Sequence, residues 1–375
     1  MADAGSPKQE PELIRTLGSD IRTVWDQVGR VGVRQTLSGS FNDLREFYLT
    51  THRRDRLAGM GRFKGTVYLA LWLIKALFLK LTPPRRLLLV VSFVLMWQGG
   101  FQINAGRTRI TLDFPFLAIV LLLLILMLEL KDKLLARNEL EAGRAVQLAL
   151  MPDHAPSIAG WDIWLFTRSA NDVGGDLVDY LQIDAARLSV VLGDVAGKGL
   201  PAALLMGKLQ STLRALGAEC ASLGELGVRV NRILHRDGLP NRFATMVYLE
   251  LTPDSGHIRF VNAGHMPPLL CDPGSVAELP RGSIALGMMP EADFVEQQVQ
   301  VSPGQMLLVY SDGVTEAMNR AGEFFGDERL RGALWAAGPS TAEQSGQRVL
   351  GAADAFTGDA HAFDDLSLVV LRRLG

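Results

Sequence analysis

The chain has 375 residues, enough for two or three domains, and its 38 Lys and Arg nearly balance its 40 Asp and Glu. The charges are unevenly distributed, because residues 1–150 hold 21 basic and 13 acidic side chains and the remainder holds 17 and 27. The basic part flanks apolar segments and has no aromatic-interleaved recognition motif, which argues against nucleic-acid binding and favours anionic lipid. The two cysteines, Cys220 and Cys271, are too few for a disulfide framework and lack zinc-site spacing.

A membrane segment is predicted at residues 65–130, after a polar and basic region at 1–64 that resembles no signal peptide. Residues 112–130 are uniformly apolar over almost the 20 or so residues that cross a bilayer core, and 87–103 form a shorter candidate span. Residues 66–81 contain two lysines, so this stretch either lies in the interface or spans.

The basic residues around these segments predict the topology. They are Arg53, Arg54, Arg56, Arg62 and Lys64, then Arg85 and Arg86, then Lys131 and Lys133. A two-span hairpin with an outer loop at Asn104–Ile110 keeps all of them in the cytoplasm, with Arg107 and Arg109 as exceptions. Three spans would place the first cluster outside. We therefore expect a multi-pass inner-membrane protein with a cytoplasmic C-terminal domain.

A helical linker is predicted at residues 131–152. Glu, Leu, Ala, Lys and Arg dominate this stretch, and Pro152 ends it. Leu128, Leu135, Ala142 and Ala149 recur at seven-residue spacing over too few heptads to establish a coiled coil. The stretch is therefore either a signalling linker or a helix packed on its own C-terminal domain.

Residues 153–375 predict one α+β domain. Short apolar strands are expected at 161–167, 187–193, 244–251, 257–262, 306–311 and 366–372. Helices are expected in two pairs, at 200–216 and 222–236, then at 328–337 and 341–356. Strands in one block with helices inserted as pairs argue against alternating βαβ units.

Aspartates lie at or beside the ends of these strand-like runs, next to glycines. They occur in Gly174-Gly175-Asp176, in Gly193 to Gly199 with Asp194, in Tyr310-Ser311-Asp312-Gly313, and in Asp364-Asp365. A lone Gly-Asp is usually a turn. Four such motifs converging on one point would repel strongly unless cations neutralised them. Oxygen ligands without His or Cys suit Mg²⁺ or Mn²⁺, which predicts a two-metal hydrolytic site.

The ordered motifs resemble those of the PPM-type (PP2C-like) metal-dependent serine/threonine phosphatases, in their stage II sporulation E and sigma-factor regulator branch. The matching stretches are 173–176 with Asp179, 193–199 running into 202–206, 243–246, 261–265 with Pro267 and Pro268, 310–317, and 364–370. The resemblance covers residues 144–373, with Ser311 where Thr is usual and Leu177-Val178 in place of an aromatic pair. It implies an α-β-β-α sandwich.

The resemblance also implies roles for the acidic residues. Asp194 should bridge two Mn²⁺ or Mg²⁺ ions, with the carbonyl of Val195 as a further ligand, and Asp176, Asp312 and Asp364 should complete the set. Asp194, Asp176 and Asp312 are thus the expected catalytic residues. Asp365 is expected to lie outside the direct ligands.

Three further residues have open roles. His265 could be a general acid, although a structural histidine is the more common case. Lys198 could meet the substrate phosphate or cover a helix end. Asp179 could orient a water molecule or cap a turn.

The resemblance implies a bacterial, membrane-anchored protein serine/threonine phosphatase, with a STAS-type anti-sigma-factor antagonist as its phosphoprotein substrate. Membrane lipid and a second copy of the chain, as a homodimer, are the other expected partners. Two alternatives remain: a catalytically silent adaptor, which loss of a ligand residue would mark, and a membrane sensor that works mainly through dimerisation.

Overall fold

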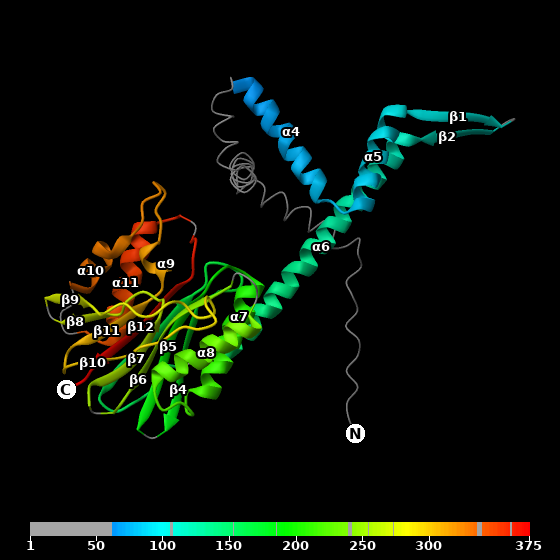
Figure 1. Ribbon diagram of the computed structural model, residues 1–375. Coiled ribbons are helices and arrows are strands. Elements are labelled where there is room, and N and C mark those ends of the chain that lie inside the picture. The colour runs from blue at the N-terminus through cyan, green and yellow to red at the C-terminus, as the bar shows by residue number, and fades with distance from the viewer. Residues whose placement is uncertain are drawn as a thin grey trace, which may run out of the picture. The chain divides into compact units, whose positions relative to one another are not determined.

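The computed structural model describes residues 62–375, apart from 106–107, 153, 185, 239–241, 254, 273, 336–339 and 361. The chain divides into two compact units, Met1–Asp132 and Lys133–Gly375, which are described separately (Figure 1). Most of the region predicted at 1–64, including Arg53, Arg54 and Arg56, lies outside the described residues.

The described part of the first unit consists of helices around a short hairpin. Helices α4 (Arg62–Lys80) and α5 (Pro83–Gln98) precede strands β1 (Gly100–Ala105) and β2 (Thr108–Asp113), and helix α6 (Phe114–Leu150) follows. A proline in the first turn starts α5, where a missing N–H costs nothing. Gly99, with a φ of 67°, ends it.

The predicted span at 87–103 is therefore too long, because the helix ends at Gln98 and the next residues form β1. The predicted outer loop at Asn104–Ile110 is the tip of an antiparallel hairpin that pairs Gly100 with Asp113. The predicted span at 112–130 starts two residues early, since Asp113 accepts a hydrogen bond from Phe116 N at 3.1 Å and the helix begins at Phe114. Hydropathy does not distinguish these strands from the helices beside them.

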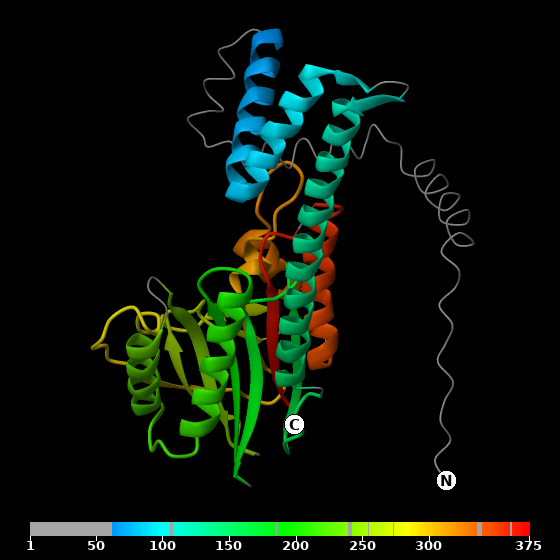
Figure 2. The ribbon, with the colours of Figure 1, turned by 90° about the vertical axis from the view of Figure 1, so that its right-hand side faces the viewer.

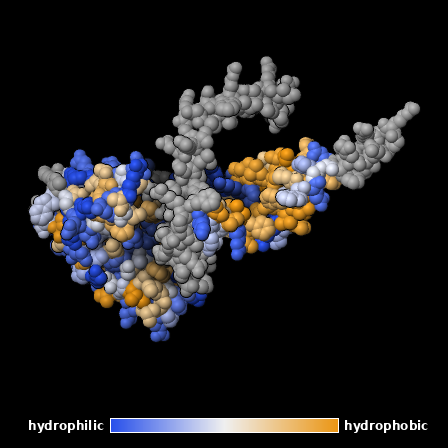
Figure 3. Space-filling model, turned by 90° about the horizontal axis from the view of Figure 1, so that it is seen from above, coloured by the Kyte–Doolittle hydropathy of each residue, from blue (hydrophilic) through white to orange (hydrophobic). Residues whose placement is uncertain are grey.

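Among the described helices, α6 alone is long and apolar enough to cross a membrane. Large apolar side chains along α4, α5 and the first part of α6 are exposed, including Leu71, Phe93 and Leu126. Figure 3 shows part of this as a mostly hydrophobic surface, in contrast to the more hydrophilic surface of the second unit in the same view. An exposed apolar surface of this kind is typical of contact with lipid or with another protein.

Two antiparallel five-stranded sheets form the centre of the second unit, as far as its residues are described. The first has the order β10-β7-β6-β5-β4, made of β4 (Leu177–Asp184), β5 (Arg187–Val195), β6 (Ala244–Leu251), β7 (His257–Ala263) and β10 (Glu296–Gln300). The second has the order β3-β12-β11-β8-β9, made of β3 (Trp161–Arg168), β8 (Leu269–Asp272), β9 (Ser275–Glu278), β11 (Met306–Tyr310) and β12 (Leu366–Arg373).

Helices cover the outer face of each sheet (Figures 1 and 2). Helices α7 (Leu200–Leu216) and α8 (Leu223–Asp237) pack on the first sheet, and α10 (Gly326–Trp335) and α11 (Ala342–Thr357) pack on the second. The short helix α9 (Asp312–Thr315) follows β11. The predicted α+β class is thus confirmed, with the layer order α-β-β-α.

Alternating side chains along the strands build the core between the sheets. Val190 and Leu192 of β5 meet Leu307 of β11 and Val369 of β12 there, and all four are fully or almost fully buried. Burial of each such side chain stabilises the fold by about 1.5–3 kcal/mol. This core holds the ends of the two sheets together, and the acidic motifs lie at those ends.

The last turns of α6 pack against the sheets and helices of the second unit. Gln147 is 5% exposed and exchanges two hydrogen bonds with Gly174, from its Nε2 to the carbonyl at 2.9 Å and from the Gly174 N–H to its Oε1 at 3.1 Å. Gln210 of α7 donates to the carbonyl of Leu150 at 2.6 Å. Of the two sequence alternatives, packing on the C-terminal domain is therefore observed, and a signalling role stays a prediction.

Candidate active site

The predicted acidic residues come from the facing ends of the two sheets. Asp176 directly precedes β4 and Asp194 is the second-last residue of β5, in the first sheet. Asp312 follows β11, and Asp364 with Asp365 directly precedes β12, in the second sheet. The antiparallel register aligns these positions, because Leu177 pairs with Gly193 and Tyr310 pairs with Leu368.

Asp194 has the most acidic surroundings. Burial, and then the charges of Asp312, Asp364 and Asp365, raise the pKa of its carboxyl to about 6. Its strand position is fixed by pairing with Thr245 of β6. A carboxyl with a raised pKa beside several others is an energetically unfavourable arrangement for anions. The arrangement favours a bound cation.

Asp176 is 3% exposed and is held by a hydroxyl. Ser367 Oγ donates a hydrogen bond to its Oδ2 at 2.5 Å. Burial, followed by repulsion from Asp194, raises the pKa of Asp176 well above its ordinary value, although the Ser367 hydrogen bond opposes this. The site therefore keeps a deeply buried acid whose ionised form would require a nearby cation.

Asp312 and Asp364 lie in the second sheet's part of the site. Burial raises the pKa of Asp312, and the charges of Asp364 and Glu316 raise it further. Asp364 is more exposed and pairs with Lys198, whose Nζ lies 3.1 Å from its Oδ2. Lys198 also donates to the carbonyl of Phe363. Lys198 thus meets one of the predicted metal ligands rather than only a helix end.

Asp365 differs from its neighbour in every contact. It is 6% exposed and accepts backbone hydrogen bonds from Ala170 at 2.8 Å and from Gly175 at 2.6 Å. Both carboxylate oxygens are thereby used to hold the loop that carries Asp176. These contacts favour the predicted division, in which Asp364 is a ligand and Asp365 supports the loop.

Two glycines permit the close approach of these loops. A β-carbon on Gly175 would lie 3.0 Å from the carbonyl oxygen of Val195, and one on Gly313 would collide with the carbonyl oxygen of Asp365. Both distances are tighter than ordinary van der Waals contact. The Val195 carbonyl, a predicted ligand, is thus accessible only because residue 175 has no side chain.

The donor set fits a hard divalent cation. It consists of carboxylates and one carbonyl oxygen, the ligands that Mg²⁺ and Mn²⁺ prefer. The ionised carboxylates repel one another, and a bound cation would relieve this repulsion. Among the described residues, no three His, Cys, Asp or Glu side chains are close enough together to hold an ion as they stand. Asp364 is paired with Lys198 instead.

Asp179 has partners outside this cluster. Its carboxylate is 3% exposed and receives two hydrogen bonds from Arg214 at 2.8 Å and one from Gln210 at 2.9 Å. A buried carboxylate needs several hydrogen bonds to offset its desolvation. These contacts join β4 to α7, and water orientation by Asp179 stays a prediction.

His265 links the two sheets. Its Nδ1 lies 2.8 Å from Thr245 Oγ1, and its Nε2 lies 3.1 Å from the carbonyl of Tyr310. Burial lowers the pKa of the imidazole to about 4, so it is neutral at pH 7. With both nitrogens engaged, the structural role ranked first on sequence grounds agrees with these contacts.

Sequence reasoning missed three residues that position the site. They are Gln147 on α6, Ser367 beside Asp176, and Arg242, whose Nη1 donates to the carbonyl of Ala196 at 2.5 Å. Gly197 has a φ of 108°, a backbone conformation that favours glycine, and the Arg242 guanidinium lies against its open side. The polar residues at 147 and 367 within otherwise apolar stretches were the available signal.

Comparison with known proteins places the second unit in a family context. The model of the family described as Stage II sporulation protein E (SpoIIE) matches residues 184–374. Protein IcfG of Synechocystis sp. is 30% identical over 276 residues, which cover 65% of this chain and 43% of IcfG. Phosphoserine phosphatase RsbU of Bacillus subtilis is 25% identical over 239 residues, which cover 63% of this chain and 70% of RsbU. The match thus spans less than half the length of IcfG.

Solved structures share the fold. The SiaA-PP2C domain of Pseudomonas aeruginosa has a TM-score of 0.56 at 19% identity, over 64% of this chain and 98% of that one. The PP2C phosphatase domain of SpoIIE from Bacillus subtilis, with a fragment of its regulatory domain, has a TM-score of 0.51 at 16% identity, over 57% and 62%. These similarities confirm the predicted PP2C-like sandwich.

Proposed function

The chain belongs to the stage II sporulation protein E family, and we propose that its second unit is a metal-dependent protein serine/threonine phosphatase. The observation that carries the proposal is the convergence of Asp176, Asp194, Asp312 and Asp364 from the ends of both sheets, with raised pKa values at the first three. Two relatives, RsbU and RsbP of Bacillus subtilis, are named phosphoserine phosphatases, which supports the same reaction here.

In this proposal, Asp176, Asp194, Asp312, Asp364 and the Val195 carbonyl hold two Mn²⁺ or Mg²⁺ ions. Such ions supply Lewis acidity toward the phosphoryl oxygens and lower the pKa of water at the site. The protein's part is to hold the ligands in place. Every predicted ligand residue is present, so a catalytically silent adaptor has no support from the residues.

The surrounding residues have distinct duties in this scheme. Ser367 orients the Asp176 carboxylate through the hydroxyl hydrogen bond. Asp365 fixes the backbone at Ala170 and Gly175, and neutral His265 fastens β6 to the end of β11. Lys198, which lies 3.1 Å from the proposed ligand Asp364, would be placed to meet a substrate phosphate at this site.

We further propose that the first unit anchors the phosphatase in the bacterial inner membrane, with the catalytic unit in the cytoplasm. Helix α6 meets the length and composition of a span. Arg85 near the start of α5 bonds to Glu129 at 2.7 Å and to Asp132 at 2.6 Å, just after the apolar run of α6. Charged ends at one level fit a two-span hairpin, in which both face the cytoplasm.

The substrate proposal comes from the family. RsbU and RsbP are named phosphoserine phosphatases, which supports a phosphoserine substrate. The resemblance of the motifs to the sigma-factor regulator branch favours a phosphorylated anti-sigma-factor antagonist of the STAS type. A homodimer is proposed on the same ground.

Substitution of the proposed ligands tests the function in the full chain, reconstituted in lipid. Asp194→Asn and Asp312→Asn should each abolish Mn²⁺-dependent phosphoserine hydrolysis while the fold is kept. Stability without metal should not fall, because each change removes like-charge repulsion. Asp184→Asn, at an exposed aspartate paired with Arg187 in the β4–β5 turn, is the matched control and should keep full activity. Wild-type turnover by either ligand variant at limiting metal would refute the assignment.

A further inference from the structure

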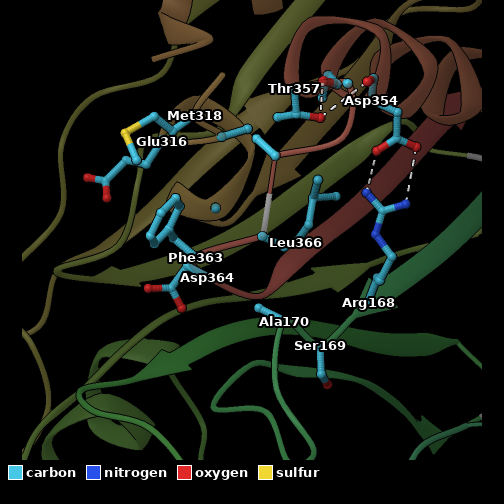
Figure 4. Close-up of a pocket in the computed structure, with 16 residues that line it drawn as sticks. Arg168, Ser169, Ala170, Glu316, Met318, Asp354, Thr357, Phe363, Asp364 and Leu366 are labelled. Carbon is cyan, nitrogen blue, oxygen red and sulfur yellow. Dashed lines mark hydrogen bonds and ion pairs between the residues drawn. The ribbon is translucent and has the colours of Figure 1, made fainter. Parts of the chain in front are cut away.

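A pocket of about 230 Å³ adjoins the predicted metal site (Figure 4). Four segments line it: the end of β3, α9 with the residues after it, the end of α11, and the segment before β12. Two of these segments carry predicted ligands, because Asp364 itself lines the pocket and the lining residue Gly313 follows Asp312. A phosphoserine bound at the metal site would therefore lie next to this pocket.

The side chains that line the pocket are mainly apolar. Phe363 is 55% exposed although it adjoins a predicted metal ligand. Met318 and Leu366, with several alanines, supply further apolar lining. A contiguous exposed apolar surface is typical of a binding site. This surface is continuous with the place where substrate must bind.

The charges in the pocket are largely compensated. Arg168 and Asp354 form a two-pronged ion pair with distances of 3.1 and 2.5 Å, which Figure 4 shows across the pocket from Phe363. The carboxylates of Glu316 and Asp364 point away from Thr357 and Leu366 in the same view. Asp364 is a proposed metal ligand. The pocket interior therefore favours binding of an apolar side chain over a charged one.

We propose that this pocket receives an aliphatic side chain of the substrate protein, close in sequence to the phosphoserine. The inference rests on the proposed phosphatase function and deepens it. A cavity of about 150 Å³ holds a benzene molecule, so about 230 Å³ accommodates one leucine-sized side chain and not a longer segment. Because the proposed ligand Asp364 lines the pocket, this side chain lies close in sequence to the phosphoserine.

A kinetic comparison of two substrate types tests the proposal with the full chain in lipid and Mn²⁺. One substrate is para-nitrophenyl phosphate, which has no neighbouring residues. The others are alanine-based phosphoserine peptides in which a single leucine, arginine or aspartate occupies each flanking position in turn. Leucine at one position should raise kcat/KM about tenfold over alanine, as expected for burying one aliphatic side chain.

Two substitutions assign that preference to the pocket. Phe363→Ala and Met318→Ala should each remove most of the leucine advantage and leave para-nitrophenyl phosphate hydrolysis unchanged. Phe324→Ala is the matched control, because Phe324 is 57% exposed, similar to Phe363, and does not line the pocket. It should keep the leucine advantage.

The outcomes separate the two claims. Hydrolysis of para-nitrophenyl phosphate without any leucine preference overturns the pocket proposal and leaves the phosphatase function standing. A preference for arginine or aspartate overturns it as well, as does an equal loss on both substrate types in the pocket variants. Failure to hydrolyse either substrate type with Mn²⁺ overturns the proposed function and, with it, the inference.

Discussion

The hydrogen bonds between Gln147 and Gly174 predict that helix α6 supports metal binding by holding the loop that carries Asp176. Replacing Gln147 with leucine keeps an approximate side-chain volume but removes the partners of one buried N–H and one buried carbonyl. Each unpartnered buried group costs about 1–3 kcal/mol, so the contact weakens by about 2–6 kcal/mol before relaxation. The affected backbone is two residues from Asp176, a proposed ligand.

The assay is the Mn²⁺ concentration that gives half-maximal hydrolysis of a phosphoserine peptide. We expect this Mn²⁺ concentration to rise at least tenfold in Gln147→Leu. A loss of about 1.4 kcal/mol in the free energy that holds the ligand loop in place is enough for a tenfold change. The rate at saturating Mn²⁺ should change less, because bound cations themselves hold the loop.

Gln210→Leu provides the matched comparison. Gln210 is also buried, at 3% exposure, and also bonds to α6, through the carbonyl of Leu150. It contacts Asp179 but not the Gly174 loop. This variant should lose stability in chemical denaturation with a smaller change in the Mn²⁺ requirement. Identical Mn²⁺ titrations of Gln147→Leu and the wild type, with the fold intact, would refute the reasoning.

Three further predictions follow from buried groups and from the linker. Burial lowers the pKa of folded His265 to about 4, against an ordinary value of 6.5. The free energy of unfolding should therefore be full above pH 6.5 and fall by about 3 kcal/mol as the pH drops toward 4. The free energy of unfolding of His265→Gln, measured against pH, should lack this decrease. Burial raises the pKa of both Cys220 and Cys271, the latter to about 12, so the native protein should resist thiol alkylation. The double Cys→Ala variant should keep its activity, and a trapped phosphocysteine would contradict the proposed mechanism. Inserting one to four alanines after Arg137 rotates the part of α6 that follows by about 100° per inserted residue. If the linker transmits a signal, the Mn²⁺ concentration for half-maximal activity in membranes should vary with insertion length. An unchanged value across the series would leave the first unit as an anchor alone.

The strands of the second unit were predictable where their apolar pattern was clean. The predicted strands at 187–193, 244–251 and 366–372 match β5, β6 and β12 within two residues at either end. Strand β4 was missed, because a buried carboxylate at Asp179 interrupts its apolar run and needs Arg214 and Gln210 from another element to be stable there. The short strands β8, β9 and β10 were missed because polar residues and few positions leave little pattern to detect.

The membrane segment was less predictable for a different reason. Hydropathy measures transfer from water and not hydrogen bonding, so it merged helix α5 with strand β1 into one candidate span. The boundary depends on Gly99, whose φ of 67° lies in the left-handed region that glycine adopts without steric strain. It also depends on the pairing of β1 with β2, which forms between segments that hydropathy scores separately.

The acidic cluster was predictable as a set of strand ends, but the parts that hold it were not. Ser367 reaches Asp176 across 191 residues of sequence, and Asp365 reaches the N–H of Gly175 across 190. Contacts of this kind use a hydroxyl, a carboxylate and a backbone amide, none of which leaves a local periodicity. The same distance in sequence explains why Asp364 and Asp365 look equivalent in the chain, although one is half exposed beside Lys198 and the other is buried against two backbone amides. In this site the sequence therefore predicts which residues carry charge, and the topology decides which of them are free to bind a cation and which hold the loops.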